Sequence, residues 1–166
     1  MASNKFVLLG CAVLLVMSSG CPGTATGGLS LRPDGSPGPE ECPAEARKAM
    51  KYLRMFVGEA AWVQLDANQT RVHPITLYEG NIESVLEDDL GLIEAPARLY
   101  GRVWTNGPQA IIRYYVAQPV KGGDQVPICA VARLGMGQLR KRSESKPGMA
   151  ILDSPRAGVY IVDEFR

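Results

Sequence analysis

The amino-acid sequence predicts an α+β protein that is mainly β, with one N-terminal helix packed on a small antiparallel β-sandwich or barrel. Two observations lead to this fold class. Apolar residues recur at three- and four-residue intervals in residues 44–57, which is the spacing of a helix with one buried side. After Gly58, apolar and polar residues alternate in short runs separated by turn-forming residues, which is typical of antiparallel strands. The pattern does not decide between a sandwich and a barrel.

The helix is expected over residues 44–57. It follows Cys42-Pro43, because proline suits the first helical position, and Glu45 suits the positive end of the helix dipole. Gly58 is a common helix-terminating residue. The expected buried stripe consists of Ala46, Ala49, Met50, Leu53, Phe56 and Val57. The other side of the helix is basic, and we interpret it as a solvated face, with lipid phosphates or an acidic partner as the alternative. Its basic residues are Arg47, Lys48, Lys51 and Arg54.

Eight short segments rich in β-branched and aromatic residues are expected to be strands. They are residues 60–66, 74–80, 81–87, 98–105, 109–117, 126–134, 149–153 and 158–165. Asn106-Gly107 and residues 121–124 have the composition of turns, so the three central segments are expected to form an antiparallel meander. Pro108 lacks the N–H that a tight two-residue hairpin would use, so the first of these turns should be loose or lie at an edge.

The first twenty residues have the three zones of a secretory signal peptide. Lys5 supplies an early positive charge, residues 6–17 are apolar, and residues 18–20 are small. A helix of this apolar length measures about 18 Å, against a hydrocarbon core of about 30 Å, so the run is too short to span a membrane. We therefore expect residues 1–20 to be removed on export. A buried core helix is the alternative.

Residues 18–21, Ser-Ser-Gly-Cys, resemble the processing site of bacterial lipoproteins. Ser18 stands where that family usually has leucine. Cys11 is a competing site, but cleavage before it would leave an apolar region too short to engage the export machinery. The resemblance implies a diacylglycerol on Cys21 and acylation of its new N-terminus, so that several acyl chains anchor the protein in a membrane.

Residues 22–41 are expected to be a flexible tether behind the lipidated Cys21. They contain four prolines and five glycines, and Leu29 and Leu31 are their only large apolar residues, so they cannot bury enough surface to offset their ordering entropy. Pro22, in place of aspartate, implies by the same resemblance that the protein is sorted to the outer membrane of a Gram-negative envelope, facing the periplasm. Residues 42–166 are expected to form a single globular domain.

The cysteines predict one disulfide. If Cys11 leaves with the signal peptide and Cys21 carries lipid, Cys42 and Cys129 remain in a compartment that oxidises thiols. Their bond would join the start of the helix to a strand of the meander. Two buried free thiols are the alternative.

No motif in the sequence specifies a reaction, and we expect neither a cofactor nor a metal ion. His73 is the single histidine, so zinc motifs that need a second histidine are excluded. The acidic turn of residues 87–89 lacks the ligand spacing of a calcium loop and is interpreted as solvated. Residues 42–166 carry sixteen basic and fourteen acidic side chains, and this weak net charge gives no reason to expect nucleic-acid binding.

Two groups of residues are candidate contact sites. Residues 135–148 break the strand pattern and are expected to form a mobile loop outside the core. Arg140, Lys141 and Arg142 in this loop would meet anionic head groups, polysaccharide or an acidic protein, with a solvated loop as the alternative. Several aromatic residues would suit carbohydrate or peptide, although strand alternation favours core packing for them. They are Trp62, Trp104, Tyr114 and Tyr115.

These observations favour a membrane-tethered, non-catalytic envelope lipoprotein that binds or scaffolds another envelope component, either a protein or a polysaccharide. One alternative is an envelope hydrolase that uses carboxylates such as Glu83, Glu87 or Asp89, for which the sequence gives no geometry. The other alternative is an inhibitor or immunity-type protein that presents the loop of residues 135–148 to its target.

Overall fold

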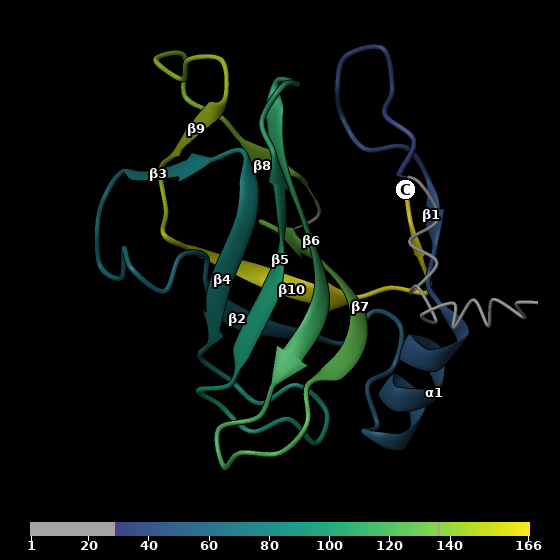
Figure 1. Cartoon of the computed structure of the whole chain (residues 1–166). Helices are drawn as coiled ribbons and strands as arrows, with labels where there is room; N and C mark the ends of the chain where they lie inside the picture. The colour runs from purple at the N-terminus through teal and green to yellow at the C-terminus, as the bar shows by residue number, and fades with distance from the viewer. Residues whose placement is uncertain (1–28, 136) are drawn as a thin grey trace, which may run out of the picture.

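The computed structural model describes residues 29–135 and 137–166. The expected signal peptide, the expected lipidation at Cys21 and the first part of the tether lie outside the described residues. Within the described residues the chain forms one helix and eleven strands (Figure 1). In chain order the elements are β1 (Glu40–Glu41), α1 (Ala44–Tyr52), β2 (Ala60–Gln64), β3 (Ile75–Tyr78), β4 (Gly80–Leu86), β5 (Arg98–Trp104), β6 (Gln109–Gln118), β7 (Val126–Arg133), β8 (Leu139–Arg140), β9 (Met149–Leu152), β10 (Arg156–Ile161) and β11 (Glu164–Phe165).

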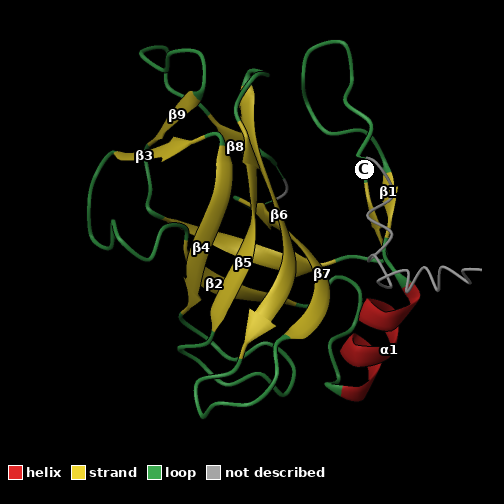
Figure 2. Cartoon of the chain, viewed as in Figure 1, coloured by secondary structure: helices red, strands yellow, loops and turns green. Residues whose placement is uncertain are grey.

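Six strands form a closed antiparallel barrel. Their hydrogen-bonded order is β5-β4-β2-β10-β7-β6, and β6 also pairs with β5, so the sheet returns to its first strand. The predicted fold class is therefore confirmed, and the closed ladder is that of a barrel. The meander of β5, β6 and β7 is confirmed as well. Figure 2 shows α1 beside the barrel, on the side opposite β3 and β9.

Alternating side chains fill the barrel. In β4, for example, Ile82, Ser84 and Leu86 are buried while the residues between them are partly exposed. Tyr114 is fully buried, and its hydroxyl lies 2.7 Å from the hydroxyl of Ser84, which donates to the carbonyl of Leu65 at 2.6 Å. Burial raises the pKa of the Tyr114 hydroxyl, so this buried pair stays neutral at ordinary pH.

The helix α1 is shorter than the sequence predicts, because it ends at Tyr52 and not at Val57. Arg54 adopts a left-handed backbone conformation with φ of 56°, which ends the helical path. The carbonyl of Leu53 accepts a hydrogen bond from the amide of Leu92 at 2.8 Å. A Cβ atom at Gly91 would lie 2.4 Å from that same carbonyl oxygen, so this approach of the loop requires glycine. Residues 53–57, which were predicted to be the end of the helix, therefore form a separate loop.

Residues 29–41 are ordered against the barrel, which differs from the tether predicted for them. β1 pairs with β11 in antiparallel register, and Ser36 is buried. We call residues 29–41 the strap. The strap contains few apolar residues, but polar contacts with the barrel hold it in place. Such long-range contacts cannot be predicted from the composition of the segment. The structured domain therefore begins before Cys42.

The contact that holds the strap is the buried side chain of Arg113 in β6, which is 1% exposed. Its Nη2 donates to the carbonyl of Gly38 at 2.7 Å, and its Nη1 lies 3.3 Å from a carboxylate oxygen of Glu40. The guanidinium lies over two aromatic rings, 5.6 Å from the centroid of Trp104 and 5.0 Å from that of Phe165. Burial lowers the pKa of Arg113, while the neighbouring Glu40 and tyrosine favour its charged form.

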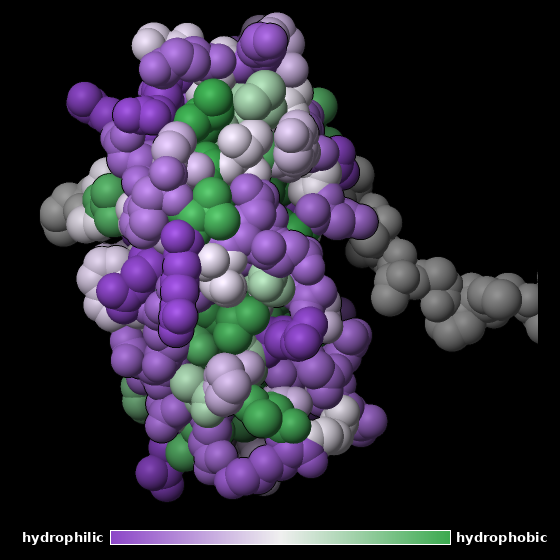
Figure 3. All heavy atoms as spheres, turned by 90° about the vertical axis from the view of Figure 1, so that its left-hand side faces the viewer, coloured by the Kyte–Doolittle hydropathy of each residue, from purple (hydrophilic) through white to green (hydrophobic). Residues whose placement is uncertain are grey.

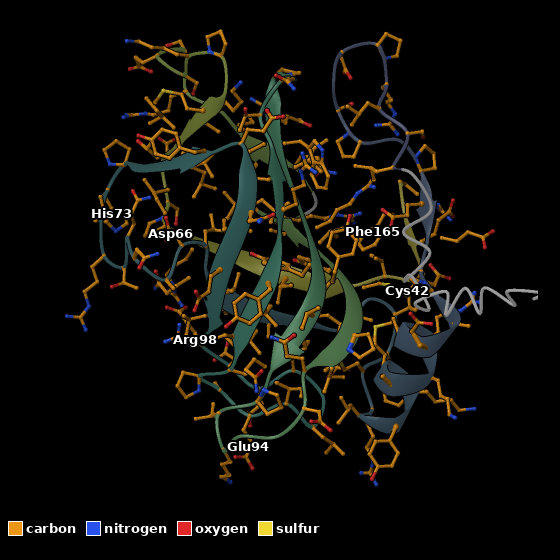
Figure 4. The ribbon with its side chains drawn as sticks, viewed as in Figure 1. Cys42, Asp66, His73, Glu94, Arg98 and Phe165 are labelled. Atoms are coloured by element: carbon orange, nitrogen blue, oxygen red, sulfur yellow. A yellow bond between two sulfur atoms is a disulfide. The ribbon has the colours of Figure 1, made fainter. Side chains whose placement is uncertain are left out.

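The predicted disulfide between Cys42 and Cys129 is confirmed. The two Cα atoms lie 5.9 Å apart, and the bond joins Cys42, two positions before the start of α1, to the middle of β7. Figure 4 shows Cys42 where the strap meets α1, on the same side of the barrel as Phe165. Ala46 and Met50, on the buried side of α1, belong to the main hydrophobic core. The disulfide and these two residues fix α1 to the barrel.

Removing the disulfide is expected to destabilise the fold by about 4 kcal/mol, because the bond closes a long loop in the unfolded chain. The test is to unfold the Cys42→Ser/Cys129→Ser double variant in urea and to monitor unfolding by tryptophan fluorescence. Cys21→Ser is the matched control and should unfold at the parent midpoint. A double variant as stable as the parent, or alkylation of both thiols in the oxidised native protein, would contradict the bond and the stabilisation that we assign to it.

Candidate functional site

A pocket lies beside the barrel, between β8 and the turn that joins β9 to β10. Its volume is about 310 Å³. Figure 1 shows β8 and β9 toward the same end of the barrel, at the top of the view. The lining residues are Leu134, Gly137, Gln138, Leu139, Arg140, Leu152, Asp153, Ser154 and Arg156. We call this the β8 pocket.

The β8 pocket exists because part of the predicted loop of residues 135–148 is ordered. Leu139 and Arg140 pair with Ala110 and Gln109 at the start of β6. The side chain of Leu139 is buried in the hydrophobic core, so the expectation that the whole loop lies outside the core is wrong at this residue. Burial of this one apolar side chain therefore contributes, with the pairing of β8 and β6, to attaching the loop to the barrel.

The three predicted contact residues have different environments. Arg140 lines the β8 pocket. Arg142 forms an ion pair with Asp153, with Nε 2.9 Å from Oδ1, and Asp153 also lines the pocket. Lys141 is directed elsewhere, because its Nζ donates to the carbonyls of Thr105 and Gly107 at 2.5 and 3.1 Å. The structure therefore brings Arg140 into the pocket and pairs Arg142 with a pocket residue, while Lys141 holds the loop to the β5–β6 turn.

Arg156 is a pocket residue that the sequence analysis missed. Its Nε and Nη2 both lie 2.5 Å from a carboxylate oxygen of Glu87, and its guanidinium lies 5.2 Å from the ring centroid of Trp62. The predicted strand began at residue 158, two residues too late. No local signal identifies Arg156, because its neighbours are Trp62 of β2 and Glu87, the residue after β4, which are far away in the sequence.

A row of residues on the outer face of the barrel continues from the pocket. Arg133, Gly158 and Trp62 are in register across β7, β10 and β2. A Cβ atom at Gly158 would lie 2.8 Å from the ring of Tyr160, so the missing side chain leaves room for that ring. The Nε of Arg133 is buried and finds no hydrogen-bond partner among the described residues. Donor capacity therefore remains unused beside the pocket.

The surface around the β8 pocket is positively charged. Its arginines are Arg133, Arg140, Arg142 and Arg156, and its carboxylates are Asp153 and Glu87, each already engaged in an ion pair. Arginine donates several N–H groups in a planar fork that fits carboxylate and phosphate groups. The arrangement is suited to hold an anionic group.

The carboxylates considered for a hydrolase do not converge on one cavity, and each of them already binds another group of the protein. Glu83 forms an ion pair with Arg98, and Glu87 is bound by Arg156. Asp89 accepts a hydrogen bond from the amide of Ala95 at 2.7 Å. General acid and base catalysis would need two carboxylates that converge on one cavity, and Asp153 is the only carboxylate among the residues that line the β8 pocket. Within the described residues there is also no group of three or more His, Cys, Asp or Glu side chains placed to hold a metal ion.

The expected default of core packing holds for most of the aromatic residues. Trp104 and Tyr114 are buried. Tyr115 is half-buried and packs against Phe165 with ring centroids 5.3 Å apart. Trp62 is 45% exposed and lies under Arg156, so it is the member of the group that contributes to the surface beside the pocket.

The face that holds β3 adjoins the β8 pocket, because β3 pairs with β9 and Leu152 of β9 lines the pocket. Figure 3 shows the face that holds β3 and the loop of residues 66–74, where hydrophilic side chains separate the hydrophobic ones into small groups. His73 lies in this loop, and Figure 4 places it at the edge of the molecule. Its ring nitrogen is 3.4 Å from the carbonyl oxygen of Asp153, a long contact for a hydrogen bond.

Comparisons of the chain with protein-family models, with curated proteins and with solved structures gave no match. Among the described residues, no helix has the length and apolar character needed to cross a membrane. The candidate site therefore rests on the geometry of the β8 pocket.

Proposed function

We propose that this protein is an exported, lipid-tethered and non-catalytic binding domain of the bacterial envelope, and that the β8 pocket recognises an anionic group of another envelope component. The binding role is inferred from the position of Arg140 and Arg156, which both line the same pocket. The ligand class that fits is a segment of an acidic protein or an acidic polysaccharide, because both present carboxylates to the arginine forks.

The disulfide supports the proposed location. Disulfides persist in oxidising compartments such as the periplasm and are rare in a reducing cytoplasm. The Cys42–Cys129 bond therefore agrees with the export that the zoning of residues 1–20 predicts. Lipid on Cys21 would then anchor the mature N-terminus.

The ordered strap limits how far the domain stands from the proposed anchor. Seven residues separate Cys21 from Leu29, the first described residue, so the Cα atoms of these two residues lie at most about 28 Å apart. The domain would then remain near the membrane surface, within reach of components that are also held in the envelope.

The other two functions have less support. The hydrolase lacks a pair of carboxylates at one cavity, as described above. An inhibitor that acts through a protruding loop needs the loop of residues 135–148 to stand free, whereas β8 attaches it to β6. Neither observation favours these alternatives over binding.

The proposed anchor is tested by mass spectrometry of the N-terminal peptide of the full chain isolated from membranes. An acylated Cys21 at the mature N-terminus is expected, and Cys21→Ser should move the protein to the soluble fraction because the acyl chains are lost. An unprocessed N-terminus, or acylation at Cys11, would refute the anchor.

The proposed pocket is tested by measuring the binding of polygalacturonate, polyglutamate and neutral dextran to the protein by calorimetry. We expect one or both acidic polymers to bind and dextran not to bind. Arg140→Glu should weaken binding at least about tenfold, because it replaces a charge-assisted contact with a repulsion.

Lys146→Glu is the matched control, since it makes the same charge change on an exposed residue of the same loop that does not line the pocket. Binding that falls equally in both variants would indicate general charge attraction and contradict a built site. A preference for one polymer over the other distinguishes a polysaccharide ligand from a protein ligand.

A further inference from the structure

A second surface lies at the end of α1, on the side of the barrel away from β3. A groove of about 230 Å³ opens there, with Arg47, Lys51, Phe56 and Val57 among its lining residues. The remaining lining residues are Met50, Met55, Ile161 and Asp163. We call this the α1 surface. It takes no part in the β8 pocket, with which it shares no residue.

The α1 surface exposes large apolar side chains. Phe56 is 67% exposed and Val57 is 63% exposed, although the helical pattern predicted both to be buried. They face the solvent because the helix ends early and the chain turns at Arg54. Adjacent exposed apolar residues of this size are a feature of interaction sites in soluble domains.

The turn that presents these side chains is held by hydrogen bonds. One carboxylate oxygen of Glu59 accepts from the amide of Phe56 at 2.9 Å, and the other accepts from the amide of Gly91 at 3.2 Å. The amide of Gly58 donates to the carbonyl of Ile161 at 2.9 Å, which attaches the turn to the end of β10. The exposed position of Phe56 and Val57 is therefore part of the folded structure.

Basic side chains surround the apolar ones. Arg47, Lys48, Lys51 and Arg54 are all exposed, and none of them forms an ion pair within the described part of the chain. The acidic residues nearby are Glu45 in the first turn of α1, Asp163 at the rim of the groove, and Glu59, whose carboxylate accepts from the Phe56 amide. The excess of unpaired cations makes the surface complementary to an anionic partner.

We propose that the α1 surface docks on an anionic lipid bilayer. Phe56 and Val57 enter the interface between head groups and acyl chains, and Arg47 and Lys51 contact lipid phosphates. Exposed apolar side chains with flanking lysine and arginine are the combination by which a surface helix holds to such an interface.

The inference goes beyond the proposed binding role and does not require it. Lipid on Cys21 would restrain the domain near a membrane, whereas the α1 surface would set its orientation on that membrane. The β8 pocket is formed by other elements of the fold, so docking through α1 would not use its arginines.

The test introduces a fluorescent reporter into the full chain by Phe56→Trp and mixes the protein with vesicles that contain bromine-labelled phosphatidylcholine. With phosphatidylglycerol present, we expect a blue shift and a loss of the added emission, because the indole enters the bromine-labelled interface. Tyr78→Trp is the matched control, since Tyr78 is an exposed aromatic residue of β3 on the other side of the barrel. Its added emission should not change.

Charge reversal separates the α1 surface from the N-terminal anchor and from the β8 pocket. Adding Arg47→Glu/Lys51→Glu to the reporter chain should weaken partition at least about tenfold, given the contribution of each basic residue near an anionic surface. Arg140→Glu should leave the quenching unchanged. If the anchor alone holds the protein, flotation of the vesicles will recover it without any quenching of the reporter.

Three results would overturn the proposal. In the first, the reporter is quenched equally in vesicles with and without phosphatidylglycerol. In the second, it is quenched in neither kind of vesicle. In the third, the reporter responds to an acidic amphipathic peptide of glutamate and leucine but not to vesicles, which would make the α1 surface a protein-binding site.

Discussion

The buried guanidinium of Arg113 determines where the N-terminal part of the domain can lie. A charged group removed from water is costly unless it is paired and hydrogen-bonded. Arg113 obtains its partners from the strap, whose Gly38 carbonyl and Glu40 carboxylate receive its N–H groups. Its flat faces lie against Trp104 and Phe165. Without the strap and β11 in place, this cation would lose the contacts with Gly38, Glu40 and Phe165.

The position of the strap has consequences along the chain. β1 pairs with β11, and the next residue, Cys42, bonds to Cys129 in β7. This connection places the start of α1 on the barrel wall, where Ala46 and Met50 enter the core. The α1 surface is then presented at the end of the helix. Tyr115 also contacts Glu40, and burial next to this carboxylate raises the pKa of Tyr115 to about 12.

The closed barrel positions the other candidate surface. The register of β10 between β2 and β7 places Arg156 next to Trp62 and brings the β9–β10 turn toward β8. The two surfaces are thus built by different parts of one rigid fold. Each is basic, and this agrees with an envelope setting in which both lipid head groups and acidic polymers carry negative charge.

Local patterns in the sequence were sufficient for the eight longer strands, the start of the helix and the disulfide, but not for the two-residue strands β1, β8 and β11. Alternation identifies β6 because its side chains face two different environments, and the cysteine count leaves one pairing in an oxidising compartment. The end of the helix was missed because Leu92, distant in sequence, captures the carbonyl of Leu53. The strap was missed because a Pro- and Gly-rich segment gives no sign that Arg113 will bind its carbonyls.

The candidate site was predictable only in part for a related reason. A run of basic residues identifies Arg140 and Arg142 as neighbours in sequence, but which of them reach a pocket depends on the pairing of β8 with β6. Arg156 joins them through the order of strands in the barrel, which is set by long-range packing. Closure of the barrel could not be predicted from local patterns, because it depends on β10 pairing with both β2 and β7, and β2 is far away in the sequence.

The most direct test of this account is a nuclear magnetic resonance measurement of arginine side-chain N–H groups in the folded protein. The account predicts one guanidinium, assigned to Arg113 by its loss in Arg113→Lys, with slow solvent exchange and ring-current shifts from Trp104 and Phe165. If every arginine side chain exchanges rapidly and none is shifted by aromatic rings, the strap is not held by Arg113 and the central claim is wrong.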